Sequence, residues 1–311
     1  MTESTFTVGT RGSQLAMTQT GYAADAVGAA AGLTPKLITV RTEGDVLTGP
    51  LSQMGGTGVF ATALRARLLD RDVDLAVHSL KDLPTAQVPG LVIAALPERE
   101  DPRDALCARD GLTLDGLPQG AAVGTGSPRR VAQLRALRPD LNIVDIRGNV
   151  GTRLNRVAPG DLDAVVLAAS GLKRLGLEGR ITEYLNPERM LPAPGQGALA
   201  LEVSSELAQD SALARGLAAV DDLPTRLAVT AERAVLARLE AGCAAPVGTY
   251  ARMVGGDLHL DVVVANPDGT EVMRRSEATD ELSVDAAAAL GVRIADELLA
   301  AGADRLARLT L

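Results

Sequence analysis

Two stretches of this chain repeat one pattern, "TVGTRGSQLA" at residues 7–16 and "AVGTGSPRRVA" at residues 122–132. Each has a short apolar run, then Gly-Thr, then a serine that opens a helix-like sequence. A second pair follows the same order, "DLAVHSLKDL" at 74–83 and "DAVVLAASGLKRL" at 163–175. Because apolar runs alternate with helical patterns in both blocks, the sequence predicts two similar α/β domains.

The segments between these blocks indicate how the chain passes from one domain to the other. The polar "EREDPRD" (98–104) predicts one crossing, and "MLPAPGQGALALEV" (190–203) predicts a return in which "ALALEV" rejoins the first domain as a strand. Two α/β domains joined by two crossings would enclose a cleft, as in hinged anion-binding proteins. The predicted domains are residues 1–97 with 198–215, residues 103–191, and residues 220–311.

The last third of the chain predicts a small α+β domain. A helical segment at 225–240 leads into "LEAGCAAPVG" (239–248), which places Cys243 on a loop of small residues. The strand-like "DLHLDVVVAN", the turn "PDG" and "TEVMRRSEA" then predict a hairpin. A final helical segment closes the domain.

Composition narrows the possible functions. The 311 residues exceed the usual size of one hydrophobic core, so more than one domain is expected. The sequence has no run of about 18 uncharged apolar residues, so it predicts no membrane-spanning helix. The N-terminus has no signal-peptide pattern, so we expect a cytoplasmic protein. Two distant cysteines and two histidines have no metal-site spacing, and we expect Cys107 to be structural.

The charge is unevenly distributed. The net charge of −8 argues against general affinity for nucleic acid. Between Gly124 and Arg156, however, there are seven arginines and only two acidic residues. One basic segment in an acidic protein favours a small anionic ligand over a polyanion.

The repeated strand-to-helix junctions are candidate anion sites. Ser127 and Pro128 suit the start of a helix, where free N–H groups favour an anion, and Arg129 and Arg130 add donors for carboxylates. The junction at residues 7–16 predicts a helix N-terminus of the same kind, with Thr10, Arg11 and Ser13 as its polar residues. Ordinary capped helices with solvent-facing arginines explain these patterns equally well.

A second candidate site follows the strand "AVHS". Lys81 and Asp82 come at its end, where ligands bind in sheets of this type, and a carboxylate there suits a developing cation. A capping aspartate beside a surface lysine is the simpler alternative. We expect His78 to pack or to form a hydrogen bond.

Taken together and in order, these motifs resemble the porphobilinogen deaminase family along essentially the whole chain. "GTRGSQLA", "AVHSLKDLPT", "EREDPRDAL", "VGTGSPRR", "IRGNVGTR", "LAASGLKRLG", "LPAPGQGALALE" and "TAERAVLARLEAGCAAPVG" carry the resemblance. It implies a transferase of porphyrin and heme biosynthesis that joins four porphobilinogen molecules head to tail, with release of ammonia, into hydroxymethylbilane. It also implies three domains, of which two are similar to periplasmic binding proteins, and a monomer.

The resemblance implies a covalent dipyrromethane cofactor, built from the substrate and bound by thioether to Cys243. It implies that Asp82 stabilises the azafulvenium cation formed when ammonia leaves. Implied cofactor-binding residues are Lys81, Asp82, Thr125, Ser127, Arg129 and Arg130. Implied residues for substrate and the growing pyrrole chain are Arg11, Ser13, Arg147, Arg153, Arg174 and Gln196.

Two positions depart from the family pattern. Thr57 in "GGTGVF" replaces the lysine of a glycine-rich loop, and Met17 replaces a tryptophan on a helix. Two other functions fit parts of the sequence. A non-enzymatic anion-binding protein of the periplasmic type explains the arginines but not Cys243, and a nucleic-acid-binding protein conflicts with the acidity and the few aromatics.

Overall fold

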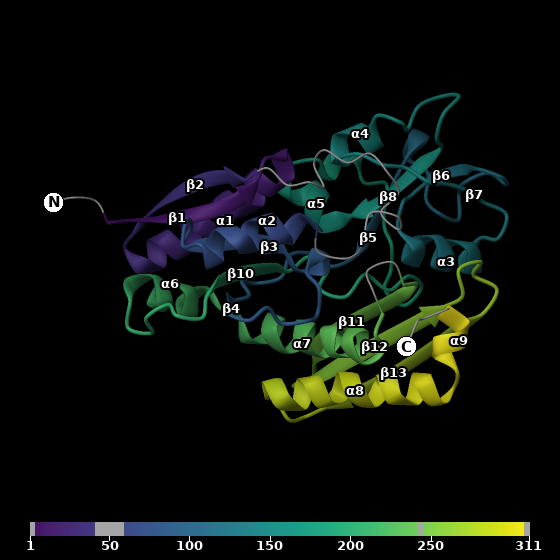
Figure 1. The fold of residues 1–311 in the computed structure, drawn as a ribbon. Coiled ribbons are helices and arrows are strands. Elements are labelled where there is room, and N and C mark those ends of the chain that lie inside the picture. Colours follow the sequence, from purple (N-terminus) through teal and green to yellow (C-terminus); the bar gives the residue numbers. More distant parts are fainter. Residues whose placement is uncertain (1–3, 41–58, 242–244, 308–311) are drawn as a thin grey trace. The chain divides into compact units, whose positions relative to one another are not determined.

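The computed structural model describes residues 4–40, 59–241 and 245–307 (Figure 1). The chain forms two compact units, residues 1–100 with 198–226 (unit 1) and residues 101–197 with 227–311 (unit 2). Unit 2 therefore includes both the predicted second α/β domain and most of the predicted C-terminal domain. The division into three domains, with its boundaries, stays a prediction.

Unit 1 is built on a five-stranded sheet with the order β2-β1-β3-β10-β4. The first three strands are parallel, and β10 runs antiparallel to both of its neighbours. Helices α1 and α6 contribute to the core on one face and α2 to the core on the other. The bounds are β1 (Thr5–Arg11), β2 (Thr34–Val40), β3 (Leu75–Ser79), β4 (Leu91–Ala95), β10 (Leu199–Ser204), α1 (Gln14–Ala31), α2 (Val59–Leu69) and α6 (Ala212–Val220).

Unit 2 contains a second five-stranded sheet with the equivalent order β7-β6-β8-β5-β9. Here β6 is parallel to β7 and β8, and β5 is antiparallel to β8. In each sheet the antiparallel fourth strand, β10 or β5, follows a predicted crossing, so the two similar α/β domains and the returning strand are confirmed. The bounds are β5 (Asp104–Ala108), β6 (Ala122–Gly124), β7 (Asn142–Val144), β8 (Ala164–Ala168), β9 (Glu183–Tyr184), α3 (Pro128–Leu137), α4 (Val150–Leu154) and α5 (Ala169–Arg174).

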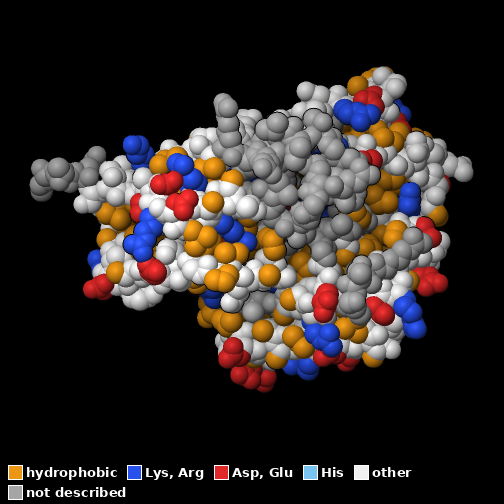
Figure 2. Space-filling model, viewed as in Figure 1, with side chains coloured by type: hydrophobic (Ala, Val, Ile, Leu, Met, Phe, Trp, Pro, Cys, Tyr) orange, Lys and Arg blue, Asp and Glu red, His pale blue; other side chains and the backbone are white. Residues whose placement is uncertain are grey.

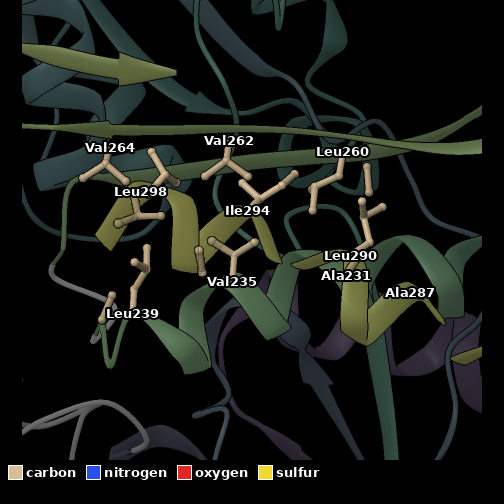
Figure 3. Close-up of a cluster of buried hydrophobic side chains, with 14 of the residues drawn as sticks. Ala231, Val235, Leu239, Leu260, Val262, Val264, Ala287, Leu290, Ile294 and Leu298 are labelled. Atoms are coloured by element: carbon tan, nitrogen blue, oxygen red, sulfur yellow. The ribbon is translucent and has the colours of Figure 1, made fainter. Parts of the chain in front are cut away.

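The C-terminal part of unit 2 is an antiparallel sheet packed against three helices. Figure 3 shows Val235 of α7 and Ile294 of α8 pointing toward Val262 of β12, and all three are fully buried or nearly so. The predicted hairpin and final helix are confirmed. The bounds are α7 (Leu223–Arg238), β11 (Val247–Val254), β12 (Asp257–Ala265), β13 (Val272–Thr279), α8 (Val284–Ala300) and α9 (Ala303–Ala307).

Strand β11 was not expected from the sequence. Its buried positions include Gly248, Thr249 and Ala251, which are small residues that give little apolar alternation. The strand is defined instead by its full register against β12, from Val247 opposite Val264 to Val254 opposite Asp257. Among the described residues, no helix is long and apolar enough to cross a membrane.

Candidate functional site

In unit 1, two parallel strands end at a shared hollow. Strand β1 ends at Arg11 and β3 ends at Ser79, and the hollow is lined by Arg11, Gln19, His78, Ser79 and Asp82 together with apolar side chains. The structure therefore brings Arg11 and Asp82 together at the carboxyl edge of the sheet, where α/β proteins bind ligands.

The segment that carries Asp82 is a single turn of 3₁₀ helix, Leu80–Asp82, directly after β3. The Leu80 N–H donates to the Ala198 carbonyl at 3.0 Å, and the buried Gln19 amide lies 3.2 Å from the Ser79 hydroxyl. Leu80 and Leu83 are buried, whereas Asp82 is exposed and Lys81 is half-buried. A buried backbone thus holds an exposed carboxylate at the hollow.

A buried ion cluster that the sequence did not predict lies next to this segment. His78 Nε2 is 3.1 Å from Glu202 Oε2, and Arg65 donates to the same carboxylate from Nε at 3.0 Å and Nη2 at 2.9 Å. Burial disfavours the ionised form of Glu202, but the nearby His78 and the hydrogen bonds from Arg65 outweigh it and lower its pKa. The signal was an acidic residue inside the apolar strand "ALALEV".

The first of the two repeated junctions is a helix start capped by its own serine. Ser13 has extended backbone angles, and its hydroxyl accepts from the Ala16 N–H at 3.3 Å. The predicted helix start at Ser13 is confirmed. Because Ser13 itself occupies one of the free N–H groups of α1, this junction offers an anion one donor fewer.

The second junction is capped differently. Ser127 occupies the N-cap position of α3 and Pro128 the first turn, as predicted, but the Ser127 side chain forms no capping hydrogen bond. The buried Thr125 hydroxyl instead accepts from the Ser127 N–H at 3.3 Å. The N-terminus of α3 therefore keeps donors that its own cap does not use.

Arg129 and Arg130 are not solvent-facing, so that alternative is wrong. They are 4% and 6% exposed, and both donate to Asp104, Arg129 Nη1 at 2.7 Å and Arg130 Nη2 at 2.8 Å. The Nε of Arg129 is buried and has no hydrogen-bond acceptor among the described residues. The sequence patterns do not single out Asp104, because it falls at the end of the predicted crossing, although an acidic residue that opens the apolar run "DALCA" is a visible signal.

The remaining predicted ligand residues of unit 2 lie on three segments. Arg153 Nε donates to the Gly148 carbonyl at 2.8 Å, and Arg147 lies 3.6 Å from Asp145 on the same turn. Arg174 of α5 donates to the Gly197 carbonyl at 2.6 Å. That Arg11, Arg147, Arg153 and Arg174 share one cleft between the two α/β domains stays a prediction.

Gln196 is fully buried in unit 2. Its Nε2 lies 2.9 Å from Asp104 Oδ1 and 2.7 Å from the Pro102 carbonyl. The structure therefore brings three predicted ligand residues, Arg129, Arg130 and Gln196, to one carboxylate.

The two cysteines differ in what the structure describes of them. Cys243 and Thr57 lie outside the described residues; in the sequence, Cys243 stands between the last residue of α7 and the first residue of β11. Cys107 is a buried residue of β5, as expected, and burial raises the pKa of its thiol to about 11. The described part of the chain contains no group of metal-ligating side chains.

Two arginines of the basic segment form ion pairs with nearby acidic residues. Arg138 pairs with Asp140 at 2.7 Å and Arg156 with Asp161 at 2.6 Å. Figure 2 shows basic and acidic side chains interspersed on the face that it draws. The buried arginines of this segment, Arg129 and Arg130, lie at the start of α3.

Comparison with known proteins agrees with these features. The family model described as "Porphobilinogen deaminase, dipyromethane cofactor binding domain" matches residues 6–212, and "Porphobilinogen deaminase, C-terminal domain" matches residues 226–300. The chain is 53% identical to the porphobilinogen deaminase of Micrococcus luteus, over 96% of this chain and 93% of that protein. It is 57% identical to that of Leifsonia xyli, over 97% and 94%.

Solved structures show a more distant likeness. A periplasmic substrate-binding protein of an ABC transporter from Coxiella burnetii is 15% identical, with a TM-score of 0.44, over 69% of this chain and 91% of that one.

Proposed function

The chain belongs to the porphobilinogen deaminase family. We propose that Asp82 acts in catalysis and that the Arg129–Arg130 pair binds the cofactor. The enzyme joins four porphobilinogen molecules head to tail, releases ammonia and forms hydroxymethylbilane. It does so on a bound dipyrromethane group, and a cofactor-binding domain of that kind matches two thirds of this chain. Family membership supports the enzyme over the non-enzymatic anion-binding protein.

One observation carries the binding half of the proposal. At the start of α3, two buried guanidiniums face a single carboxylate, so one buried positive charge is left without a counter-ion among these three side chains. Dipyrromethane carries acetate and propionate groups, and buried cations are stabilised by such anions. The residues present therefore fit the cofactor.

The neighbouring groups suit the same ligand. The uncapped N-terminus of α3, with Thr125 and Ser127 beside it, offers N–H and hydroxyl donors to a carboxylate. We propose that these residues and Lys81 hold the cofactor's acid groups and that Cys243 anchors it by thioether. When bound, dipyrromethane supplies the pyrrole carbon to which the first substrate molecule is joined.

The catalytic half rests on Asp82. Asp82 is exposed and lines a hollow that Arg11 and Ser79 also line. We propose that Arg11 orients a substrate carboxylate there. Asp82 would accept a hydrogen bond from the pyrrole N–H and stabilise the cation left when ammonia departs. Ser13, Arg147, Arg153, Arg174 and Gln196 are proposed to bind substrate and the extending chain.

Porphobilinogen is the substrate that the family implies. We propose that the enzyme acts as a cytoplasmic monomer that binds neither nucleic acid nor membrane. The net charge of −8 and the interspersed surface charges support the lack of nucleic-acid affinity.

Intact mass spectrometry tests the proposal. Active protein should carry the added mass of two linked pyrrole units, and peptide mapping should place that mass on Cys243. A Cys243→Ser variant should lack the added mass and show no turnover, and a Cys107→Ser variant provides the matched control that retains both. Fully active wild-type protein with an unmodified Cys243 would sink the mechanism.

A further inference from the structure

Asp104, the first residue of β5, is the centre of a buried polar cluster. It is fully buried, and its Oδ1 accepts from Arg130 Nη2 at 2.8 Å, from Arg130 Nε at 3.1 Å and from Gln196 Nε2 at 2.9 Å. Its Oδ2 accepts from Arg129 Nη1 at 2.7 Å. One carboxylate thus contacts two elements, the first turn of α3 and the return crossing.

Without the Asp104 carboxylate, the positions of Arg129 and Arg130 would be electrostatically unfavourable for three reasons. Two adjacent cations repel each other, and the first turn of a helix disfavours positive charge because the helix dipole is positive there. Burial removes the water that would otherwise screen them. Burial also disfavours the ionised form of Asp104, but Arg129 and Arg130 outweigh it and hold the pKa of that carboxyl well below its usual range.

The same cluster holds the return crossing. Arg129 Nη1 donates to the Leu191 carbonyl at 2.6 Å, and the Gln133 amide both accepts from the Leu191 N–H at 2.8 Å and donates to its carbonyl at 2.9 Å. Gln196 of the crossing binds Asp104. Arg130 Nη1 donates to the Val166 carbonyl of β8 at 3.0 Å. Asp104 therefore contacts both arginines, whereas the crossing holds Arg129 and β8 holds Arg130.

We infer that Asp104 is the positioning residue of the cofactor site: it holds Arg129 and Arg130 side by side before the cofactor arrives and leaves one positive charge to select a carboxylate. This inference rests on the proposed function, in which the arginine pair binds the cofactor's acid groups. Asp104 neutralises half of the buried charge, so the unloaded protein is stable enough to fold. The other half is neutralised by the ligand.

The stability of unloaded protein tests the charge balance. In a Cys243→Ser background, Asp104→Asn should lower the melting temperature by roughly 10 °C, because it leaves two buried cations without a counter-ion. Adding Arg130→Gln should recover at least half of that loss, since it removes the repulsion. Asp140→Asn is the matched control, because Asp140 pairs with Arg138 beyond the other end of α3 in a partly exposed contact. It should shift the melting temperature by no more than about 2 °C.

The rate of cofactor assembly tests positioning. With Cys243 present, unloaded protein is incubated with porphobilinogen below its melting temperature, and loading is followed by intact mass. Asp104→Asn should load at least tenfold more slowly than wild type and than Asp140→Asn. Loading at the wild-type rate, or no recovery of stability in the Asp104→Asn/Arg130→Gln double variant, overturns the inference. If wild-type protein never loads, the proposed function fails instead, and the stability measurement still tests Asp104.

Discussion

The two repeated strand-to-helix junctions share a sequence pattern but differ in how they treat charge. At α1, Ser13 caps its own helix and the nearby Arg11 borders an open hollow with the exposed Asp82. At α3, the serine forms no cap and two arginines are buried in the first turn against Asp104. The same sequence pattern therefore leaves Arg11 beside the accessible carboxylate of another segment in unit 1 and buries a preorganised cation pair in unit 2.

This difference separates chemistry from binding. A group that stabilises a transient cation must reach the reacting atoms, so an exposed carboxylate beside a hollow suits it. A group that holds one ligand through many turnovers benefits from burial and fixed geometry instead. We therefore expect substitutions at Asp82 and at the Arg129–Arg130 pair to impair different steps.

The largest effect is expected at Asp82. Asp82→Asn removes the charge at nearly constant shape, so the protein should fold and load its cofactor while kcat falls by about 100-fold or more. Steady-state kinetics with porphobilinogen, together with intact mass, measures both. Asp72→Asn in the same unit, where Asp72 forms an exposed ion pair with Arg67, should leave kcat unchanged. Near-normal kcat in Asp82→Asn would remove Asp82 from catalysis.

A smaller effect on a different step is expected at Arg129. Arg129→Gln removes one of the two guanidiniums, so cofactor loading should fall by about tenfold, the equivalent of about 1.4 kcal/mol in binding. Molecules that do load should turn over at a rate close to wild type, because Asp82 is intact. Intact mass gives the loaded fraction, and kcat is then expressed per loaded molecule.

Arg135→Gln is the control for this prediction. Arg135 lies on the same helix, is exposed and donates to the Pro267 carbonyl at 3.2 Å, so its loss should not affect loading. Full loading of Arg129→Gln with reduced turnover would reverse the assigned division between binding and chemistry.

Local patterns predicted most of the fold. The strands and helices around residues 7–16 and 122–132 follow from apolar runs and helix-start residues that lie next to each other in the sequence, and the repeat itself predicted two similar sheets. Strand β11 could not be predicted, because its small buried residues are defined by pairing with β12.

The site was predictable only in part, for a related reason. Arg129 and Arg130 were found by residue type, but their partner Asp104 precedes them by about 25 residues and meets them only through the antiparallel insertion of β5 beside β8. Arg65, His78 and Glu202 meet in the same way, from three separate elements of unit 1. Pairing between distant segments depends on topology, which short motifs do not encode.

The smallest effects should come from the two capping serines, and they compare the junctions directly. Ser13→Ala removes a capping bond to the Ala16 N–H and should cost about 1 kcal/mol, with faster hydrogen exchange in the first turn of α1. Ser127→Ala removes no such bond and should change the stability of unloaded protein by less than about 0.5 kcal/mol.

Hydrogen exchange measured on unloaded protein, in a Cys243→Ser background, resolves each helix start separately. In cofactor-loaded protein with Cys243 present, exchange in the first turn of α3 should be slower than in this unloaded variant, because its N–H groups gain carboxylate acceptors. Exchange at α1 should change less, because Ser13 already occupies one of its donors. Equal protection of both helices by the cofactor would show that the two junctions serve the ligand alike and that capping does not distinguish them.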